Sequence, residues 1–280
     1  MKHVPFLLRP VGKDYLWGGE RLKTAYHKQI DLTPLAETWE CSTHPDGCSI
    51  VDSGTAAGKP LRTVLQEHPE YLGTYANPEG DLPILIKLID AKKDLSVQVH
   101  PDDAYAKQYE NGQNGKTEMW YVLEAEPDAS LVYGFQHTMT PERLRQSLAE
   151  GTLEADLQSV PVSKNDAFLI PAGTVHAIGA GILLAEIQQS SNLTYRLYDY
   201  NRTDAQGNKR PLHIEKAVAT VDYQQKPLPE QNRTVEQKDG YTEELLCACP
   251  YFQVSRLHLQ AETPALAAAV STTNAFAVLL

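Results

Sequence analysis

Short runs of apolar residues, many with polar residues at alternate positions, recur along most of the chain. They are rich in β-branched and aromatic residues and are bounded by Pro, Gly, Asp and Asn, which is typical of β-strands. No helical pattern recurs between them, so the sequence predicts a mainly β fold, a sandwich or barrel. The predicted strands lie within residues 83–91, 95–100, 119–125, 130–135, 167–173, 176–189, 193–200, 252–259 and 276–280.

Two segments are predicted to be helices that pack on the β core. Residues 140–157 open with Thr140 as the N-cap and Pro141 in the first turn, and Gly151 divides the segment in two. Residues 60–73 begin with Pro60 and are interrupted at Pro69.

The C-terminal part reads as a separate, smaller unit. Residues 224–240 are polar, contain Pro, Gln and Gly and show no periodicity, so we interpret them as a linker between a main unit at 1–223 and a second unit at 241–280. The phrases VSRLHL and NAFAVLL of the second unit faintly repeat SVQVH and TEMWYVL of the first. The apolar ending FAVLL would leave an unpaired strand edge, so we expect the natural chain to continue or the sequence to be a truncated form.

The charge balance narrows the choice of partner. The chain has 36 Asp and Glu against 25 Lys and Arg, a net charge of −11. Nucleic acids and anionic membranes recruit basic surfaces, so neither is an expected partner. A local pocket of basic groups can still bind a small anionic molecule, and nothing in the sequence indicates an obligatory protein partner.

The cysteines and the apolar stretches indicate the compartment. The four cysteines, at positions 41, 48, 247 and 249, have spacings that fit neither a disulfide framework nor a thiolate zinc site, and we expect them to be reduced. No stretch approaches the ~20 apolar residues of a membrane span, and the apolar run near the start is too short for a signal peptide. The sequence therefore predicts a cytoplasmic protein.

Gln98 and His100 are the first polar residues that need an explanation. In SVQVHPDD they alternate with Val97 and Val99, and because strand side chains alternate, the two polar groups would share one face. A buried amide or imidazole without a partner is costly. We expect a metal ion to be that partner.

Two further residues extend this prediction. His176 follows a Pro-Gly turn in PAGTVH, and Glu118 begins the apolar run of TEMWYVL. Alone, such a histidine is more often structural and such a glutamate is more often solvated. Together with Gln98 and His100, they can converge inside one barrel and supply nitrogen and oxygen ligands to a divalent ion such as zinc, with a coordination position left open.

The same stretches resemble known families. P-x-G-x-x-H at 171–176 resembles the second motif of the cupin superfamily, whose fold is a double-stranded β-helix, or jelly roll. DLSVQVHPDD, GKTEMWYVLEA, IPAGTVHAIGAG and LTYRLYDYNR are together similar to type I mannose-6-phosphate isomerases in their short bacterial form, as are YLWGG, AETWECSTHPDG and ILIKLIDA. The resemblance covers residues 1–215 well and the rest loosely. It implies a catalytic cupin domain with helical insertions at 1–223 and a partial second cupin-like domain at 241–280, where the family has a complete one.

The resemblance also implies roles for individual residues. The metal ligands fall on Gln98, His100, Glu118 and His176, and the glutamine matches only the longer members of the family. The catalytic arginine falls on Arg196, and pocket lysines fall on Lys116 and Lys87. The implied cofactor is one zinc ion per chain, or another divalent metal.

The implied reaction interconverts mannose 6-phosphate and fructose 6-phosphate through an enediol(ate), so a sugar phosphate is the expected partner. The proton-transferring base stays open among Lys116, Lys87, a metal-bound water and a carboxylate. Alternatively, Lys87 extends to the surface, or Arg196 forms an ion pair with Asp199 or another acidic residue.

Two other functions stay open at this stage. Two histidines and a carboxylate also form the facial triad of non-haem Fe(II) oxygenases, several of which share the jelly-roll fold. A non-catalytic carbohydrate-binding or regulatory cupin would keep the metal for structure, but it would have no use for Arg196 and Lys116.

Overall fold

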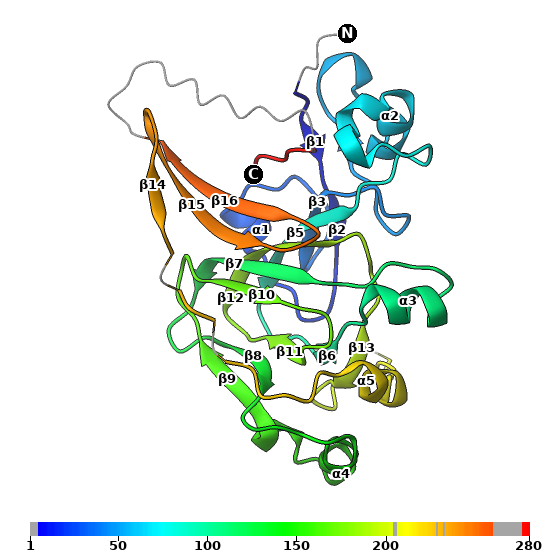
Figure 1. Cartoon of the computed structure of the whole chain (residues 1–280), viewed down its shortest axis with the longest axis vertical. Helices are drawn as coiled ribbons and strands as arrows, with labels where there is room; N and C mark the ends of the chain where they lie inside the picture. Colours follow the sequence, from blue (N-terminus) through cyan, green and yellow to red (C-terminus); the bar gives the residue numbers. More distant parts are fainter. Residues whose placement is uncertain (1–4, 204–205, 228, 232, 260–275) are drawn as a thin grey trace.

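Two antiparallel sheets face each other and form a jelly roll (Figure 1), which confirms the predicted fold class. The computed structural model describes residues 5–203, 206–227, 229–231, 233–259 and 276–280. The six-stranded sheet has the order β10 (Ala167–Ile170), β7 (Glu118–Ala125), β12 (Ile182–Gln189), β5 (Ile84–Ala91), β3 (Glu37–Cys41) and β2 (Val11–Lys13). The five-stranded sheet has the order β13 (Tyr195–Tyr198), β6 (Val97–Val99), β11 (His176–Ile178), β8 (Ser130–Phe135) and β9 (Leu157–Pro161).

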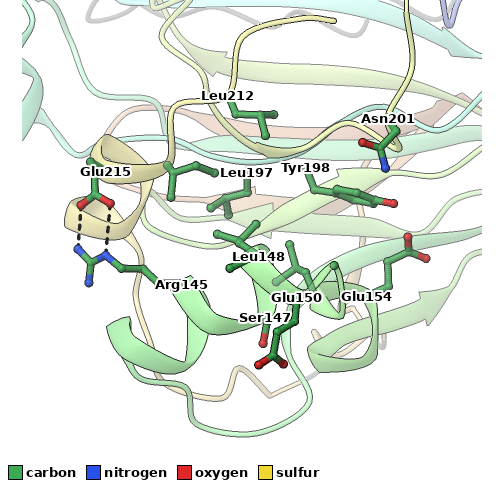
Figure 2. A pocket seen from close by; sticks show the side chains of 14 residues that line it. Arg145, Ser147, Leu148, Glu150, Glu154, Leu197, Tyr198, Asn201, Leu212 and Glu215 are labelled. Atoms are coloured by element: carbon green, nitrogen blue, oxygen red, sulfur yellow. Dashed lines mark hydrogen bonds and ion pairs between the residues drawn. The ribbon is translucent and has the colours of Figure 1, made fainter.

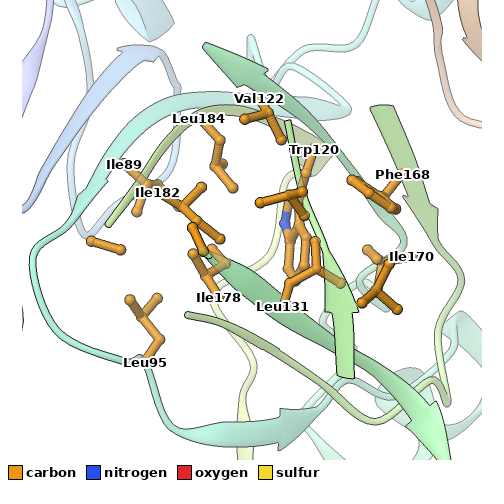
Figure 3. Close-up of a cluster of buried hydrophobic side chains, with 14 of the residues drawn as sticks. Ile89, Leu95, Trp120, Val122, Leu131, Phe168, Ile170, Ile178, Ile182 and Leu184 are labelled. Carbon is orange, nitrogen blue, oxygen red and sulfur yellow. The ribbon is translucent and has the colours of Figure 1, made fainter. Parts of the chain in front are cut away.

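The central core lies between these two sheets. Trp120 and Val122 of β7 and Leu184 of β12 pack with Leu131 of β8 and Ile178 of β11, and all five are buried (Figure 3). Each fully buried large apolar side chain stabilises the fold by about 1.5–3 kcal/mol. This core fixes the two sheets relative to each other, so the residues on their facing surfaces have defined positions.

Helices cover the outer faces. α4 (Pro141–Glu150) and α5 (Ile214–Thr220) pack on the five-stranded sheet, where Val97 and Val99 join their apolar cluster. Because these two valines point outward, strand alternation turns Gln98 inward, as predicted. On the six-stranded sheet, α1 (Arg21–Thr24) and α2 (Leu61–Glu67) contribute to a second outer cluster.

Both predicted helices form, and their ends have local causes. Thr140 Oγ1 accepts a hydrogen bond of 3.1 Å from the Arg143 amide, and Gly151 ends α4 with a φ of 70°. A short 3₁₀ turn, η3 (Leu153–Asp156), follows. The second predicted helix is α2 followed by η2 (Pro69–Tyr75), with Pro60 as the N-cap residue.

The single strand predicted at 176–189 is wrong, because the segment forms two strands in different sheets. β11 ends at Ile178, and β12 begins at Ile182 in the opposite sheet. Gly181 turns the chain with a φ of 84°, and a Cβ on Gly179 would lie 1.9 Å from the Ser130 carbonyl oxygen. The two glycines therefore allow the corner.

Other elements lie where no strand or helix was predicted. They are β1 (Leu8–Arg9) paired with β4 (Ile50–Val51), the strands β2, β3, β9 and β15 (Tyr241–Ala248), the short helices α1 and α5, α3 (Asp103–Tyr109) and the 3₁₀ turn η1 (Gly54–Ala56), besides β14 (Val235–Gln237) in the predicted linker. Asp102 caps α3 by accepting from the Tyr105 amide at 2.8 Å. None of the helices in the described residues is long and apolar enough to cross a membrane.

The C-terminal segment forms a three-stranded sheet of β14 (Val235–Gln237), β15 (Tyr241–Ala248) and β16 (Gln253–Leu259). β14 lies inside the predicted linker. Cys247 joins the apolar cluster on the six-stranded sheet, and Phe276 and Val278 pack against the same cluster. No strand forms over residues 276–280, contrary to the prediction, while residues 260–275 lie outside the described part. The division into two domains stays a prediction. All four cysteines are free thiols.

Candidate metal centre and active site

Three of the predicted metal ligands converge between the two sheets. His100 follows β6, Glu118 begins β7 and His176 begins β11, and their ligand atoms all lie within 4.8 Å of one another. Glu118 Oε2 is 3.4 Å from His100 Nε2, and Glu118 Oε1 is 3.3 Å from His176 Nε2. All three side chains are at most 1% exposed.

Backbone contacts explain the convergence. His176 pairs with Gln98 across β11 and β6, which places it beside the predicted polar pair. The Gly173 amide donates to the His100 carbonyl at 2.9 Å, so the Pro-Gly turn before His176 is fastened to the end of β6. The Lys116 amide donates to the Pro101 carbonyl at 3.0 Å and brings the start of β7 to the same place.

Both imidazoles present the same nitrogen to the centre. His100 Nδ1 contacts the Leu193 carbonyl oxygen and His176 Nδ1 contacts the Thr174 carbonyl oxygen, each at 2.8 Å. A carbonyl only accepts, so each Nδ1 is the donor and each neutral ring turns an unprotonated Nε2 toward Glu118. Metal-binding histidines are oriented in this way.

The electrostatics favour the protonation states that a metal needs. Burial, with the nearby Lys116 ammonium, lowers the pKa of His100 to about 3, and burial also lowers the pKa of His176. Burial alone would raise the pKa of Glu118, but the adjacent Lys116 ammonium, the largest opposing cause, helps to hold that pKa well below its usual range. The centre is thus two neutral imidazoles and one carboxylate.

These residues fit a divalent ion. Within the described residues, neither oxygen of Glu118 accepts a hydrogen bond, although Lys116 Nζ lies 2.7 Å from Oε2 as an ion-pair partner. Lys116 offsets part of the cost of burying this charge, and a bound cation would supply the partner that Glu118 Oε1 lacks among the described residues. The Gln98 amide lies 3.4 Å from His176 Nε2, at the edge of the cluster.

A cavity of about 300 Å³ opens beside the cluster and contains the other predicted residues. Gln98, Lys87, Lys116 and Arg196 all line it. Lys87 is 5% exposed, so it does not extend to the surface. Its Nζ lies 3.0 Å from Glu186 and 3.8 Å from Glu37. Burial lowers the pKa of Lys87, but the two carboxylates outweigh this effect and raise it above its usual value, so Lys87 is a fixed cation.

Arg196 also does not form the alternative ion pair with Asp199. Its Nε donates to Ser96 Oγ at 3.2 Å and its Nη1 donates to the Pro211 carbonyl at 2.8 Å. Asp199 instead pairs with Arg202 and Arg210. The guanidinium of Arg196 is therefore available to the cavity.

Several cavity residues were not predicted: Tyr15, Trp17, Glu37, Glu186 and Arg210. Glu186 had a detectable signal, because it is the only charged residue in LLAEIQQ, a run whose eight-residue strand is buried throughout. Its Oε2 accepts from Trp120 Nε1 at 3.0 Å, and its Oε1 accepts no hydrogen bond within the described chain.

A larger cavity, about 580 Å³, lies elsewhere, between α4, β13 and the segment before α5 (Figure 2). Leu148, Leu197 and Leu212 line it, and Arg145 and Glu215 form an ion pair at its rim. None of the predicted site residues lines it, so its size does not make it the active site.

A jelly roll that gathers two histidines and a glutamate able to hold a metal ion, beside a cavity lined by four cationic side chains and two carboxylates, defines the class as a cupin with a candidate metal centre. Comparison with known proteins gives the particular family. Residues 6–130 match the family described as phosphomannose isomerase type I, catalytic domain. Because relatives matched over most of their length share more than 30% of their residues with it, the chain belongs to the type I phosphomannose isomerase family.

Three relatives illustrate the similarity. The chain is 46% identical over 218 residues to the probable mannose-6-phosphate isomerase GmuF of Bacillus subtilis, a match that spans 78% of this chain and 68% of GmuF. It is 40% identical to the mannose-6-phosphate isomerase ManA of the same organism over 92% of this chain and 81% of ManA. The crystal structure of a mannose 6-phosphate isomerase from B. subtilis superposes with a TM-score of 0.86 at 34% identity, covering 92% and 81% of the two chains.

Proposed function

We propose that the protein is a metal-dependent aldose–ketose isomerase that interconverts mannose 6-phosphate and fructose 6-phosphate. The observation that carries this proposal is the group of His100, Glu118 and His176 beside a cavity that Lys116 and Arg196 line. Membership of the phosphomannose isomerase family supports mannose 6-phosphate as the substrate. We further propose zinc as the metal, since two imidazoles and a carboxylate suit it, and the cytoplasm as the compartment.

The reaction moves a proton between C2 and C1 of the open-chain sugar and passes through an enediol(ate). When bound, the metal supplies Lewis-acid stabilisation of the sugar oxygens on which negative charge develops. We propose that His100, Glu118 and His176 hold it, with Gln98 as a fourth ligand.

The chain's own side chains have three further tasks. Arg196 provides fixed positive charge and spare N–H donors beside the developing oxyanion. Lys87, held between Glu186 and Glu37, places a fixed ammonium on the cavity wall without itself losing a proton. The proton is carried by a group that can exchange one, either Glu186, whose Oε1 lies 3.0 Å from Lys87 Nζ and 3.9 Å from Lys116 Nζ, or Lys116 itself.

The two alternative functions, an iron oxygenase and a non-catalytic cupin, explain fewer of these observations. An iron oxygenase or a non-catalytic cupin explains the two histidines and the glutamate, but neither accounts for a cavity with Lys87, Lys116 and Arg196 on its wall. The family comparisons also favour neither.

A coupled assay for fructose 6-phosphate tests the proposal directly. Purified protein is expected to convert mannose 6-phosphate, to lose this activity on chelation and to regain it when zinc is restored. No conversion by the metal-loaded protein, together with oxygen uptake in the presence of iron, would support the oxygenase instead.

A further inference from the structure

The four cationic side chains that line the cavity differ in how their charges are paired. Lys87 Nζ lies 3.0 Å from Glu186, and Lys116 Nζ lies 2.7 Å from Glu118. The other two cations are Arg196, on β13, and Arg210, whose charge acts on Arg196, and together they form the arginine end of the cavity. No carboxylate of the described residues lies within 4.0 Å of the Arg196 guanidinium.

Both arginines keep unused donors. Arg196 uses Nε and Nη1 on Ser96 and Pro211, and Arg210 uses Nε and Nη2 on Asp199, at 2.8 and 2.6 Å. Among the contacts of the described residues, Arg196 Nη2 and Arg210 Nη1 therefore have no acceptor. Arginine's planar fork is suited to two-point recognition of an anion's oxygens.

The local charge also favours binding of an anion. Asp199 is shared, because Arg202 Nη2 contacts the same carboxylate at 2.5 Å. Two guanidinium groups, those of Arg202 and Arg210, thus pair with one carboxylate, and the Arg196 guanidinium nearby has no carboxylate partner in the described part of the chain, in a protein whose net charge is −11. Burial, and next the nearby Arg210, lower the pKa of Arg196, in agreement with an excess of positive charge. A phosphate monoester carries close to two negative charges at neutral pH.

The strand register fixes the separation of this end from the metal centre. His176 pairs with Gln98, and Gln98 pairs with Arg196, so the three residues lie side by side on β11, β6 and β13. Neighbouring strands are ~4.8 Å apart, so the Arg196 backbone lies roughly 5 Å from β6, which carries Gln98, and roughly 10 Å from β11, which begins with His176. An extended six-carbon sugar whose C1 and C2 lie at the metal centre would carry its C6 substituent toward this end.

We propose that the Arg196–Arg210 end of the cavity is the phosphate subsite and that Arg210, oriented by Asp199, is the residue that binds the substrate's phosphate. This inference rests on the proposed function and deepens it. Arg196 lies between the reacting carbons and the phosphate, whereas Arg210 contacts the phosphate only.

The test compares Arg210→Gln with Arg202→Gln. Both substitutions remove one guanidinium from Asp199, but only Arg210 lines the cavity. For Arg210→Gln, the KM for mannose 6-phosphate is expected to rise at least about ten-fold, the size expected for a lost charged hydrogen bond, with a much smaller change in kcat. Competitive inhibition by inorganic phosphate should weaken by a similar factor. For Arg202→Gln, both constants should stay within about two-fold of the unsubstituted protein.

The outcomes separate this inference from the proposed function. An unchanged KM in Arg210→Gln would overturn the subsite. Equal increases of KM in the two variants would also overturn it, because the effect would then come from the loop around Asp199. Calorimetric titration of the metal-loaded protein with inorganic phosphate needs no turnover. Binding that Arg210→Gln abolishes and Arg202→Gln retains supports the subsite even if no isomerase activity is found, and absence of binding to the unsubstituted protein refutes it.

Discussion

At the residue scale, two buried carboxylates flank Lys87 in nearly equivalent surroundings. Glu186 accepts from Trp120 Nε1 at 3.0 Å, and Glu37 accepts from Trp39 Nε1 at 2.8 Å. Only Glu186 also faces Lys116, whose Nζ is 3.9 Å from its Oε1. Glu186 is thus the carboxylate that lies between the two cavity lysines and beside the metal centre.

This difference predicts unequal effects of two matched substitutions. Glu186→Gln should lower kcat by about 10²–10⁴-fold, because the amide cannot exchange a proton, with metal content unchanged. Glu37→Gln, which removes a comparable buried charge from Lys87, should lower it less than about ten-fold. Steady-state kinetics with metal analysis of both variants checks this. Equal losses would indicate that the charge on Lys87, rather than proton transfer, is what the carboxylates provide.

Arg196 gives a second prediction at this scale. Arg196→Ala should reduce isomerisation by at least about 10²-fold, the cost typical of removing one preorganised oxyanion donor, while the protein keeps its metal. Turnover and metal content are measured on the same preparation. If turnover is unchanged, Arg196 has no catalytic role.

The site residues were predicted from the sequence where strand alternation or a sequence motif identified them. Alternation in SVQVH was enough to separate Val97 and Val99 from Gln98, because a strand has only two faces. The charge pairing was not predictable, because Lys87 meets Glu186 and Glu37 only after three strands from distant parts of the chain align in register.

At the scale of elements, the Pro171–Gly173 turn holds the metal centre together. Gly173 has a φ of 84°, its amide donates to His100, and a Cβ there would lie 3.0 Å from the Thr220 carbonyl oxygen. A side chain would therefore strain the turn and also press on the end of α5.

Gly173→Ala is expected to destabilise the fold by at least ~1–2 kcal/mol, the cost of a left-handed L-residue, and also to weaken metal binding. Gly151→Ala is the matched control, since Gly151 has a φ of 70° but open space around its Cβ position and no link to the centre. Thermal unfolding and metal titration of both variants are compared. Equal metal affinity in the two would contradict the role of the turn.

Elements with strong local signals were predicted well, and those decided by distant contacts were not. Thr140, Pro141 and Gly151 define α4 through local backbone chemistry. The run at 176–189 contains Gly179 and Gly181, which permit a turn, but nothing local that requires a change of sheet, because the corner depends on the approach of Ser130 to Gly179. Short edge strands such as β1 and β4 are stabilised by each other and carry almost no pattern of their own.

At the scale of the whole molecule, the metal centre joins the two sheets. Glu118 belongs to the six-stranded sheet, whereas His100 and His176 lie on the five-stranded sheet or at its end. A bound ion would therefore cross-link the sandwich, and binding to the folded state alone stabilises it by mass action.

Saturating zinc should raise the melting temperature on the order of 10 °C, since free metal at 1,000 times Kd contributes about 4 kcal/mol. A chelator should reverse the shift, and Glu118→Gln should abolish it. The shift is followed by circular dichroism. A zinc response that survives Glu118→Gln would mean that the ion binds elsewhere.

The overall architecture was accessible from the sequence, because alternating runs without intervening helices leave few β folds. The packing of β14–β16 was not, since it depends on Cys247 and Phe252 meeting an apolar cluster whose other buried members come from residues between Leu22 and Ile187.

The central claim is that His100, Glu118 and His176 share one cation, and anomalous diffraction at the zinc edge from crystals of the zinc-loaded protein tests it most directly. The account predicts one strong peak per chain within about 2.0–2.2 Å of both Nε2 atoms and of a Glu118 oxygen. A peak elsewhere, or none at these three residues in a protein that isomerises mannose 6-phosphate, would contradict it.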